Sequence, residues 1–481
     1  MAKEKISRQE LRVRDPKERI KDFKEVALGF SEEQALLEAQ RCLACKKKPC
    51  CKGCPVDIDI PEFITLIAKK DYRAAIDKIR EKNNLPAICG RVCPQETQCE
   101  SLCALLGKGE SVAIGSLERF VADWEMKNPE SKNSLRKETE GRQSSAIDDM
   151  RYTKDERRIK VAVVGAGPAG LTAAADLAKY GYKVTLFESL SDSGGVLRYG
   201  IPEFRLPKKI VKAETEYIKS LGVEINYNML IGRTFSIEDL FKDDYKAIFL
   251  GTGAGLPYFI GIPGENLNGV YSANEFLTRV NLMHAYEFPR YKTPVRIGER
   301  VAVIGAGNTA MDCVRVAKRL GAKDAIIVYR RSEKEAPARR AEIEHAKEEE
   351  IEFRFLTAPL KIEGNEKGEV KSMACIKMEL GEPDAGGRRK PIPVKDSEYV
   401  MPVDTVVVAI GQGPNPLISK TTEGFEINSD GELKIDENFM TSVKGIFAGG
   451  DITTGEGTVI AAMGAGKKAA ADMDHYLRGM E

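Results

Sequence analysis

Nine of the eleven cysteines lie between Cys42 and Cys103. Thiolates on short, proline-flanked loops are the usual ligands of iron–sulfur clusters, and two [4Fe–4S] clusters would use about eight ligands. Structural zinc is the alternative, but zinc sites favour Cys-x2-Cys pairs combined with histidines, and this segment has no His. The spacing therefore favours clusters over zinc and is Cys42-x2-Cys45-x4-Cys50-x3-Cys54-Pro55, then Cys89-x3-Cys93-Pro94-x5-Cys99-x3-Cys103.

A glycine-rich turn follows the apolar strand expected over Lys160–Val164. The turn contains Gly165, Gly167, Pro168, Ala169 and Gly170, and an Ala-rich helix is expected to follow over Leu171–Tyr180. A second strand, Lys183–Phe187, ends at Glu188, whose carboxylate could accept hydrogen bonds from ribose hydroxyls. A plain glycine-rich loop is the alternative, but the full context predicts a dinucleotide site with the pyrophosphate at the helix N-terminus.

The same pattern recurs after the strand expected over Arg300–Ile304. Its turn contains Gly305, Gly307, Asn308 and Thr309, with Ala310 in place of the last glycine. The next strand, Ala325–Tyr329, ends at Arg330 and Arg331, whose guanidinium groups could grip a ribose 2′-phosphate. This arrangement favours NADPH over NADH. The alternative is that the two arginines only cap a strand at the surface.

The elements around these motifs divide the 481 residues into parts. We expect an α-helical domain over 1–127, including helices at Glu32–Gln40 and Pro61–Ile79, and a polar linker over 128–158. Two doubly wound α/β domains would follow, one over 159–291 and 410–481, where a final helix is expected at Thr458–Leu477, and one inserted over 292–409.

Charge and hydropathy exclude some classes of protein. Lys plus Arg (74) nearly balance Asp plus Glu (73), so the sequence gives no electrostatic case for nucleic acid or for a membrane surface. No apolar run is long enough to span a bilayer, and the first ten residues are charged, so we expect a cytoplasmic protein. With only His284, His345 and His475, chemistry built on several histidines is disfavoured.

Taken together, the motifs resemble the small-subunit family of NADPH-dependent glutamate synthase. That family also includes the large subunit of NADH-dependent ferredoxin:NADP oxidoreductase, archaeal sulfide dehydrogenase and the N-terminal half of dihydropyrimidine dehydrogenase. The matching stretches are Arg41-Cys42-x2-Cys45, Cys50-x3-Cys54-Pro55, Gly90-Arg91-Val92-Cys93-Pro94, Gly194-Gly195-Val196-Leu197-Arg198-Tyr199-Gly200-Ile201-Pro202, Phe204-Arg205-Leu206-Pro207-Lys208, Tyr329-Arg330-Arg331 and Gly457-Thr458-Val459.

The resemblance implies FAD in the first nucleotide site, with Asp451 at its ribityl or phosphate region. The other implied FAD residues are Gly194, Gly195, Arg198, Gly200, Arg205, Thr252, Gly253, Gly450, Gly457, Thr458 and Val459. It also implies one cluster on Cys42, Cys45, Cys50 and Cys93, and a second on Cys54, Cys99, Cys103 and Glu118. In the competing assignment Glu118 is an ordinary helix residue, and Cys89 or Cys51 completes the second cluster.

The implied activity is hydride transfer from NADPH to FAD and relay of single electrons through two clusters. Such transfer needs orientation but no acid or base from the protein. The expected role is the NADP(H)-binding subunit of NADH-dependent ferredoxin:NADP oxidoreductase or of glutamate synthase, with sulfide dehydrogenase as an alternative.

The expected partner is a second electron-transfer subunit (a flavoprotein or the glutamate synthase large subunit) or an identical chain, and ferredoxin is a further candidate. A thioredoxin-reductase-like enzyme would carry Cys-x2-Cys in its NADPH domain, where only Cys313 and Cys375 occur. A non-enzymatic iron–sulfur scaffold would not need two nucleotide motifs.

Overall fold

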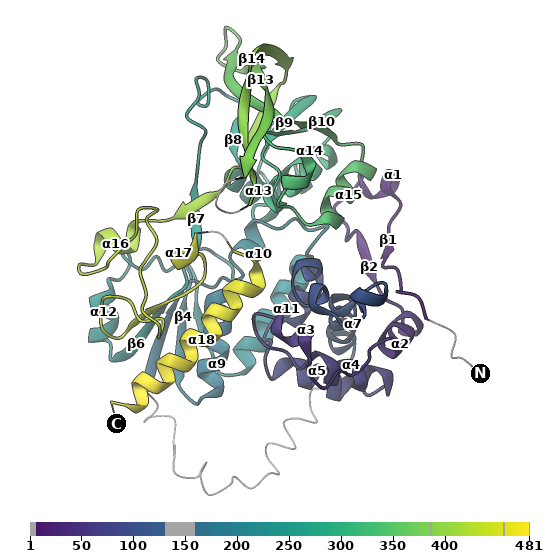
Figure 1. Cartoon of the computed structure of the whole chain (residues 1–481). Coiled ribbons are helices and arrows are strands. Elements are labelled where there is room, and N and C mark those ends of the chain that lie inside the picture. The colour runs from purple at the N-terminus through teal and green to yellow at the C-terminus, as the bar shows by residue number, and fades with distance from the viewer. Residues whose placement is uncertain (1–5, 130–158, 384–386, 456, 481) are drawn as a thin grey trace, which may run out of the picture.

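The computed structural model describes residues 6–129, 159–383, 387–455 and 457–480. Three parts lie against one another in Figure 1: a helical domain in purple and blue, a sheet domain in teal and yellow, and a green domain above them. The predicted linker, 128–158, lies outside the described residues from residue 130 onward. Among the helices of the described residues, none is long and apolar enough to cross a membrane.

The cysteine domain is built from short helices. They are α1 (Pro16–Arg19), α2 (Glu32–Gln40), α3 (Pro49–Lys52), α4 (Ile60–Ala68), α5 (Tyr72–Arg80), α6 (Pro86–Val92) and α7 (Ile114–Lys127), with a small β1–β2 pair (Arg12–Val13, Ala27–Gly29). The single helix expected over Pro61–Ile79 is two helices, because Lys70 adopts a left-handed conformation (φ 63°) and Asp71 caps α5.

Gly90 shows why α6 and α7 can pack closely. A Cβ atom at Gly90 would lie 2.6 Å from the backbone nitrogen of Arg119 on α7. The glycine in the Gly90-Arg91-Val92-Cys93 motif therefore brings the two helices together. This contact fixes α6, which carries Cys89, against α7, which carries Glu118.

The first nucleotide domain has a parallel five-stranded sheet in the order β17-β6-β3-β4-β5. The strands are β3 (Lys160–Val164), β4 (Lys183–Phe187), β5 (Glu224–Asn226), β6 (Tyr245–Leu250) and β17 (Ile446–Ala448). Helices α9 (Pro168–Lys179) and α18 (Val459–Arg478) pack on each other, and α10 (Val196–Tyr199), α11 (Lys208–Ser220), α12 (Ile237–Lys242), α16 (Leu417–Thr421) and α17 (Asp451–Thr454) complete the domain.

The second nucleotide domain has the parallel order β11-β10-β9-β15-β8. Its strands are β8 (Val270–Ser272), β9 (Arg300–Ile304), β10 (Asp324–Tyr329), β11 (Glu352–Phe355) and β15 (Thr405–Val408), and its helices are α13 (Ala273–Asn281), α14 (Asn308–Arg319) and α15 (Arg340–Glu348). The residues of β8 were expected to belong to the first domain, and no strand was predicted there. Strand β8 joins the second sheet by pairing with β15, so this sheet begins before residue 292.

An antiparallel sheet projects from the second domain and was not foreseen from the sequence. It consists of β12 (Thr357–Gly364) and the long pair β13 (Val370–Pro383) and β14 (Arg389–Pro402), seen at the top of Figure 1. The chain passes between the two nucleotide domains through β7 (Ala254–Pro257) and β16 (Gln412–Pro414), which pair with each other. The second domain is thus inserted into the first, as expected.

Candidate functional site

The first glycine-rich turn lies where β3 ends and α9 begins. Gly165 has φ +100°, and a Cβ there would lie 2.5 Å from the Gly251 carbonyl oxygen, while a Cβ at Gly170 would lie 1.9 Å from the Gly165 carbonyl oxygen. Gly167 is different, because no atom lies nearer than 4.0 Å to its Cβ position. Gly165 and Gly170 therefore close the turn, and Gly167 leaves an open side where a pyrophosphate could approach α9.

Glu188 is anchored to this turn by its buried carboxylate. One oxygen accepts from the Ala166 backbone N–H and the other from the Leu190 N–H, each at 2.8 Å. The oxygen bonded to Leu190 also accepts from Ser189 Oγ at 3.1 Å, so the oxygen bonded to Ala166 is the one that could accept a further hydrogen bond from a ribose hydroxyl. The position of Glu188 at the end of β4 is the one that the sequence predicts.

The remaining predicted FAD residues, with one exception, gather at this same edge of the sheet. The Gly194 N–H donates to the Ala166 carbonyl, and a Cβ at Gly195 would lie 2.9 Å from Gly167 Cα. A Cβ at Gly450 would meet Ala169, and one at Gly457 would lie 3.2 Å from Asp451 Oδ1. The others lie on the same segments: Arg198 and Gly200 at α10, Thr252 and Gly253 after β6, and Thr458 and Val459 at the start of α18.

Arg205 is the exception, and its predicted role as an FAD residue does not agree with its place. Its guanidinium lies between the two nucleotide domains, 2.7 Å from Asp312 on α14 and 3.1 Å from Glu342 on α15. Both carboxylates are buried, so they hold the Arg205 side chain away from the glycine-rich turn. Arg205 therefore joins the domains.

Tyr199 was not singled out as a site residue. Burial, together with the negative charges of Asp451 and Glu188, raises the pKa of its hydroxyl to about 12. The phenol thus lies within the electrostatic reach of two predicted FAD residues. It lies inside the motif 194–202, but the spacing alone does not distinguish it from its neighbours.

The second glycine-rich turn repeats the geometry of the first. Gly305 has φ +132° and a Cβ there would lie 2.2 Å from the Ala409 carbonyl oxygen, whereas Gly307 has only Pro337 near it, at 4.0 Å. Asn308 and Thr309 form the first turn of α14, and Asn308 Oδ1 accepts from the Arg339 N–H at 3.0 Å. The open side of Gly307 again faces the N-terminus of a helix.

The two arginines after β10 have different surroundings. Arg330 is exposed, but Arg331 is 9 % exposed and its Nε donates to the Arg389 carbonyl oxygen on β14 at 2.9 Å. Arg331 therefore connects the sheet to the projecting antiparallel strands. Of the predicted pair, Arg330 is thus the exposed residue.

The cysteines surround two separate pockets. The outer pocket has an empty volume of about 360 Å³ and is lined by Cys42, Cys45, Cys50 and Cys103. The inner pocket, of about 350 Å³, is lined by Cys54, Cys89, Cys93, Cys99 and Glu118. In the described part of the chain, no three His, Cys, Asp or Glu side chains converge closely enough to hold a single metal ion. Four ligands spread around a cavity suit a multi-iron cluster better than zinc.

This grouping corrects the predicted ligand sets, because Cys93 and Cys103 exchange places. Cys93 ends α6, which packs on α7, and so faces Glu118. Beyond Pro94 the chain turns back through two short 3₁₀ segments (Gln95–Thr97, Glu100–Leu102) toward α3, which brings Cys103 to the pocket of Cys50. Gly53 allows this return, since a Cβ there would lie 2.6 Å from the Gln98 carbonyl oxygen.

Glu118 lies in the wall of the inner pocket and is 6 % exposed. Its Oε1 accepts from Asn83 Nδ2 at 2.6 Å, and burial raises the pKa of the carboxyl to about 8. Cys89 lines the same pocket, whereas Cys51 lines neither of the two. Glu118 is therefore not an ordinary solvated helix residue, and both Glu118 and Cys89 stay candidates for the fourth ligand.

The inner pocket touches the first nucleotide domain through α18. Ile460 lines it, Gln98 Nε2 lies 3.4 Å from Thr458 Oγ1, and Met463 Sδ lies 3.5 Å from Cys89 Sγ. Sequence reasoning missed Ile460 and Met463, because apolar residues on a helix carry no signal beyond packing. Helix α18 begins at the predicted nucleotide motif Gly457-Thr458-Val459, so the glycine-rich turn and the inner pocket share one helix.

Two family models match the chain. One, described as dihydropyrimidine dehydrogenase domain II with a 4Fe–4S cluster, covers residues 19–130, and the other, described as pyridine nucleotide-disulphide oxidoreductase, covers residues 159–466. These matches confirm the predicted fold class and the predicted cofactors: FAD, NADP(H) and [4Fe–4S] clusters.

Known proteins match over most of the chain. The glutamate synthase [NADPH] small chain of Escherichia coli is 37 % identical over 476 residues, covering 97 % of each chain. The NADP(+)-dependent formate dehydrogenase subunit beta of Moorella thermoacetica is 39 % identical over 445 residues, which are 89 % of this chain and 60 % of that protein's length. The chain thus spans less than two thirds of that relative.

Solved structures show the same fold. FprA from Mycobacterium tuberculosis in complex with NADPH aligns with a TM-score of 0.56 at 21 % identity, over 68 % of this chain and 87 % of that one. Thioredoxin reductase from Lactococcus lactis aligns with a TM-score of 0.50 at 21 % identity, over 67 % and 100 % of the two chains. At these identities the likeness concerns the fold alone.

Proposed function

Because the chain belongs to the glutamate synthase small-chain family, within the pyridine nucleotide-disulphide oxidoreductases, we propose that it is the NADP(H)-binding subunit of a larger electron-transfer complex. It is an NADP(H)-dependent oxidoreductase whose cofactors are FAD and [4Fe–4S] clusters. When bound, these groups convert a two-electron hydride donor into a source of single electrons.

In this proposal the residues of the chain bind these cofactors and orient them. The open sides of Gly167 and Gly307 receive the pyrophosphates of FAD and NADPH at the N-termini of α9 and α14. Arg330, at the end of β10, receives the 2′-phosphate. The proposed ligands are Cys42, Cys45, Cys50 and Cys103 in the outer pocket, and Cys54, Cys93, Cys99 and Glu118 in the inner pocket.

The observation that carries the proposal is the contact of the inner pocket with α18. The N-terminus of this helix carries the predicted FAD motif, and its first turn lines the inner pocket through Ile460. A separate scaffold domain would not need this contact. The contact supports electron passage from the flavin side to the inner pocket, and from there to the outer one.

Two complexes fit this role. One is glutamate synthase, in which the chain would deliver electrons, and the other is NADH-dependent ferredoxin:NADP oxidoreductase. The small subunit of the first and the large subunit of the second share the motifs described above, so the identity of the partner subunit distinguishes them. The names of the relatives, which are subunits of glutamate synthase, formate dehydrogenase and an NADPH-Fe(3+) oxidoreductase, support a partner in general.

The test uses the anaerobically purified holoprotein. We expect a yellow-brown protein with about one FAD and about eight iron atoms per chain, whose flavin absorbance is bleached by NADPH. Extraction of FMN only, or of no flavin, would contradict the proposal. Adding a glutamate synthase large subunit should then give NADPH-dependent glutamate formation if that complex is the right one.

A further inference from the structure

Asn83 is a fully buried residue in the turn between α5 and α6. Its backbone N–H donates to the Ile79 carbonyl oxygen at 2.8 Å, and its side-chain Oδ1 accepts from the Leu85 N–H at 2.9 Å, just before α6 begins. Because a backbone N–H can only donate, the oxygen of the Asn83 amide must be the atom that faces Leu85. The turn therefore fixes the orientation of the amide and leaves its NH2 group to bond elsewhere.

The Asn83 amide nitrogen bonds the carboxylate of Glu118 on α7. Nδ2 donates to Oε1 at 2.6 Å. In the part of the chain that the structure describes, Glu118 forms no ion pair, and its Oε2 accepts no hydrogen bond. A buried carboxylate is normally paired with a cation or bound to a metal. Asn83 therefore holds one oxygen of Glu118 and leaves the other available to iron in the inner pocket, which Glu118 lines.

The same amide meets the other candidate ligand, Cys89, with its acceptor atom. Asn83 Oδ1 lies 3.7 Å from Cys89 Sγ, and Met463 Sδ lies 3.5 Å from the same sulfur. A carbonyl oxygen beside a sulfur favours the thiol, which can donate to it, over the thiolate, which is the form that binds metals. One fixed amide thus offers a donor to the carboxylate of Glu118 and an acceptor to the thiol of Cys89.

We propose that Asn83 is a positioning residue that selects Glu118 over Cys89 as the fourth ligand of the inner cluster and sets the reduction potential of that cluster. Its hydrogen bond to Oε1 draws electron density from the carboxylate, so Glu118 is a weaker donor to iron and the cluster is easier to reduce. This inference rests on the proposed function, which puts a cluster in the inner pocket, and adds the residue that determines how readily that cluster accepts an electron.

The experiment measures the reduction potentials of both clusters in the anaerobic holoprotein, by redox titration followed with electron paramagnetic resonance. Asn83→Ser removes the amide NH2 group but keeps an oxygen for the Leu85 N–H, because a serine hydroxyl can accept across the same turn. The matched control is Asn84→Ser. Asn84 is also fully buried and its Nδ2 also donates to a carboxylate, Asp176 Oδ1 at 2.8 Å, but it does not line the inner pocket.

Asn83→Ser should make reduction of the inner cluster roughly tenfold less favourable, which is about 59 mV for one electron, and leave the potential of the outer cluster unchanged. Asn84→Ser should destabilise the fold but leave both potentials unchanged. Asn83→Asp keeps the side-chain volume and the acceptor for Leu85, and its added negative charge should shift the inner potential in the same direction. It provides the measurement if the serine variant does not fold.

A double-mutant cycle shows whether Asn83 acts through Glu118. In a Glu118→Gln background, Asn83→Ser should shift the inner potential much less than in the parent protein, because a neutral amide oxygen gains less from an N–H donor than a carboxylate does. Equal shifts in both backgrounds, or an unchanged inner potential in both Asn83 variants, would overturn the inference. So would loss of the inner cluster in Cys89→Ser but not in Glu118→Ala. A parent protein with about four iron atoms and one cluster signal would instead overturn the proposed function.

Discussion

Met463 Sδ on α18 lies 3.5 Å from Cys89 Sγ on α6, and this contact joins the first nucleotide domain to the cysteine domain beside the inner pocket. Met463 and Gly464 follow Ile460 by three and four residues, so both lie on the face of α18 that carries Ile460. Ile460 lines the inner pocket, and Gly464 lies against Pro55, which follows Cys54. One helix face therefore sets the separation between the flavin side and the inner pocket.

Gly464→Ala should widen this separation. A Cβ at Gly464 would lie 2.7 Å from the Pro55 carbonyl oxygen, so the helix or the Cys54–Pro55 loop must move. We expect flavin reduction by NADPH to be unchanged in rapid mixing, while reduction of the clusters slows. The control is Gly479→Ala at the C-cap of the same helix, where the atom nearest to the added Cβ is 3.5 Å away. Equal cluster reduction in both variants would contradict the prediction.

Glu118 is expected to complete the ligands of the inner cluster. Glu118→Ala should lower the iron content from about eight to about four atoms per chain, or change one of the two cluster signals in electron paramagnetic resonance. Glu118→Gln, which keeps an oxygen donor, should retain both clusters, and so should Cys51→Ser. If Cys89→Ser removes a cluster and Glu118→Ala does not, Cys89 is the ligand instead.

The parts of the fold that the sequence predicts well are those with a local cause. Strands β3, β4 and β9 and helix α2 have the predicted bounds, because an apolar run before a glycine-rich turn and a capping box at Ser31 are short-range signals. The sequence also predicts which turns bind nucleotides, because each glycine-rich turn, the strand before it and the acidic or basic residues that end the next strand lie in one continuous segment of the chain.

What the sequence did not predict depends on distant contacts. The Arg205 side chain bonds to Asp312, more than a hundred residues away in the sequence, and so lies apart from the FAD residues of its motif. Cys93 and Cys103 exchange pockets because the chain reverses between them, and cysteine spacing does not record that reversal. Strand β8 has only three residues and is held by its pairing with β15, so no periodicity reveals it.

Arg330 is predicted to select NADPH over NADH. A charge-assisted contact with the 2′-phosphate contributes about 1.5–3 kcal/mol, so Arg330→Ala should lower the kcat/KM for NADPH roughly ten- to hundred-fold and leave that for NADH unchanged. Arg331→Ala is the comparison, because its guanidinium is held by the β14 carbonyl of Arg389. Dye reduction with each nucleotide measures both. A larger loss in Arg331→Ala would show that Arg331 binds the phosphate.

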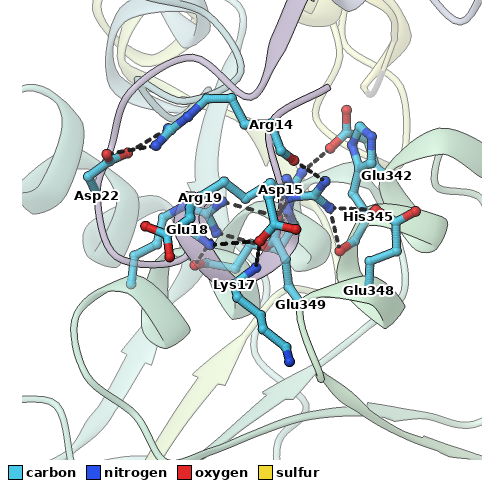
Figure 2. A network of polar contacts seen from close by, with 12 residues as sticks. Arg14, Asp15, Lys17, Glu18, Arg19, Asp22, Glu342, His345, Glu348 and Glu349 are labelled. Atoms are coloured by element: carbon cyan, nitrogen blue, oxygen red, sulfur yellow. Dashed lines mark hydrogen bonds and ion pairs between the residues drawn. The ribbon is translucent and has the colours of Figure 1, made fainter. Parts of the chain in front are cut away.

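A buried ion network ties α1 to the second nucleotide domain. Figure 2 shows Arg19 of α1 reaching Glu348 and Glu349 at the end of α15. The Glu349 carboxylate also pairs with Arg315 and Arg319 at 2.8 Å and is fully buried. Burial alone would raise the pKa of Glu349, but the hydrogen bonds and charges of Arg315 and Arg319 outweigh it and lower the pKa well below its usual value of 4.5.

Glu349→Gln should therefore destabilise the protein by about 3–5 kcal/mol at pH 7, because it leaves buried arginines without their counter-charge. Glu348→Gln, whose side chain is 51 % exposed, should cost only about 0–1 kcal/mol. A carboxyl group whose pKa is lower in the folded than in the unfolded state stabilises the folded protein at pH values above its unfolded pKa. This contribution to the free energy of unfolding is lost as the pH falls below that pKa. The gap in free energy of unfolding between the parent protein and Glu349→Gln should thus narrow by about 1.4 kcal/mol for each pH unit below about 4.5. Urea unfolding followed by circular dichroism at pH 7, 4.5 and 3.5 measures this gap, and a gap that does not change with pH would show that Glu349 is not held ionised by the arginines.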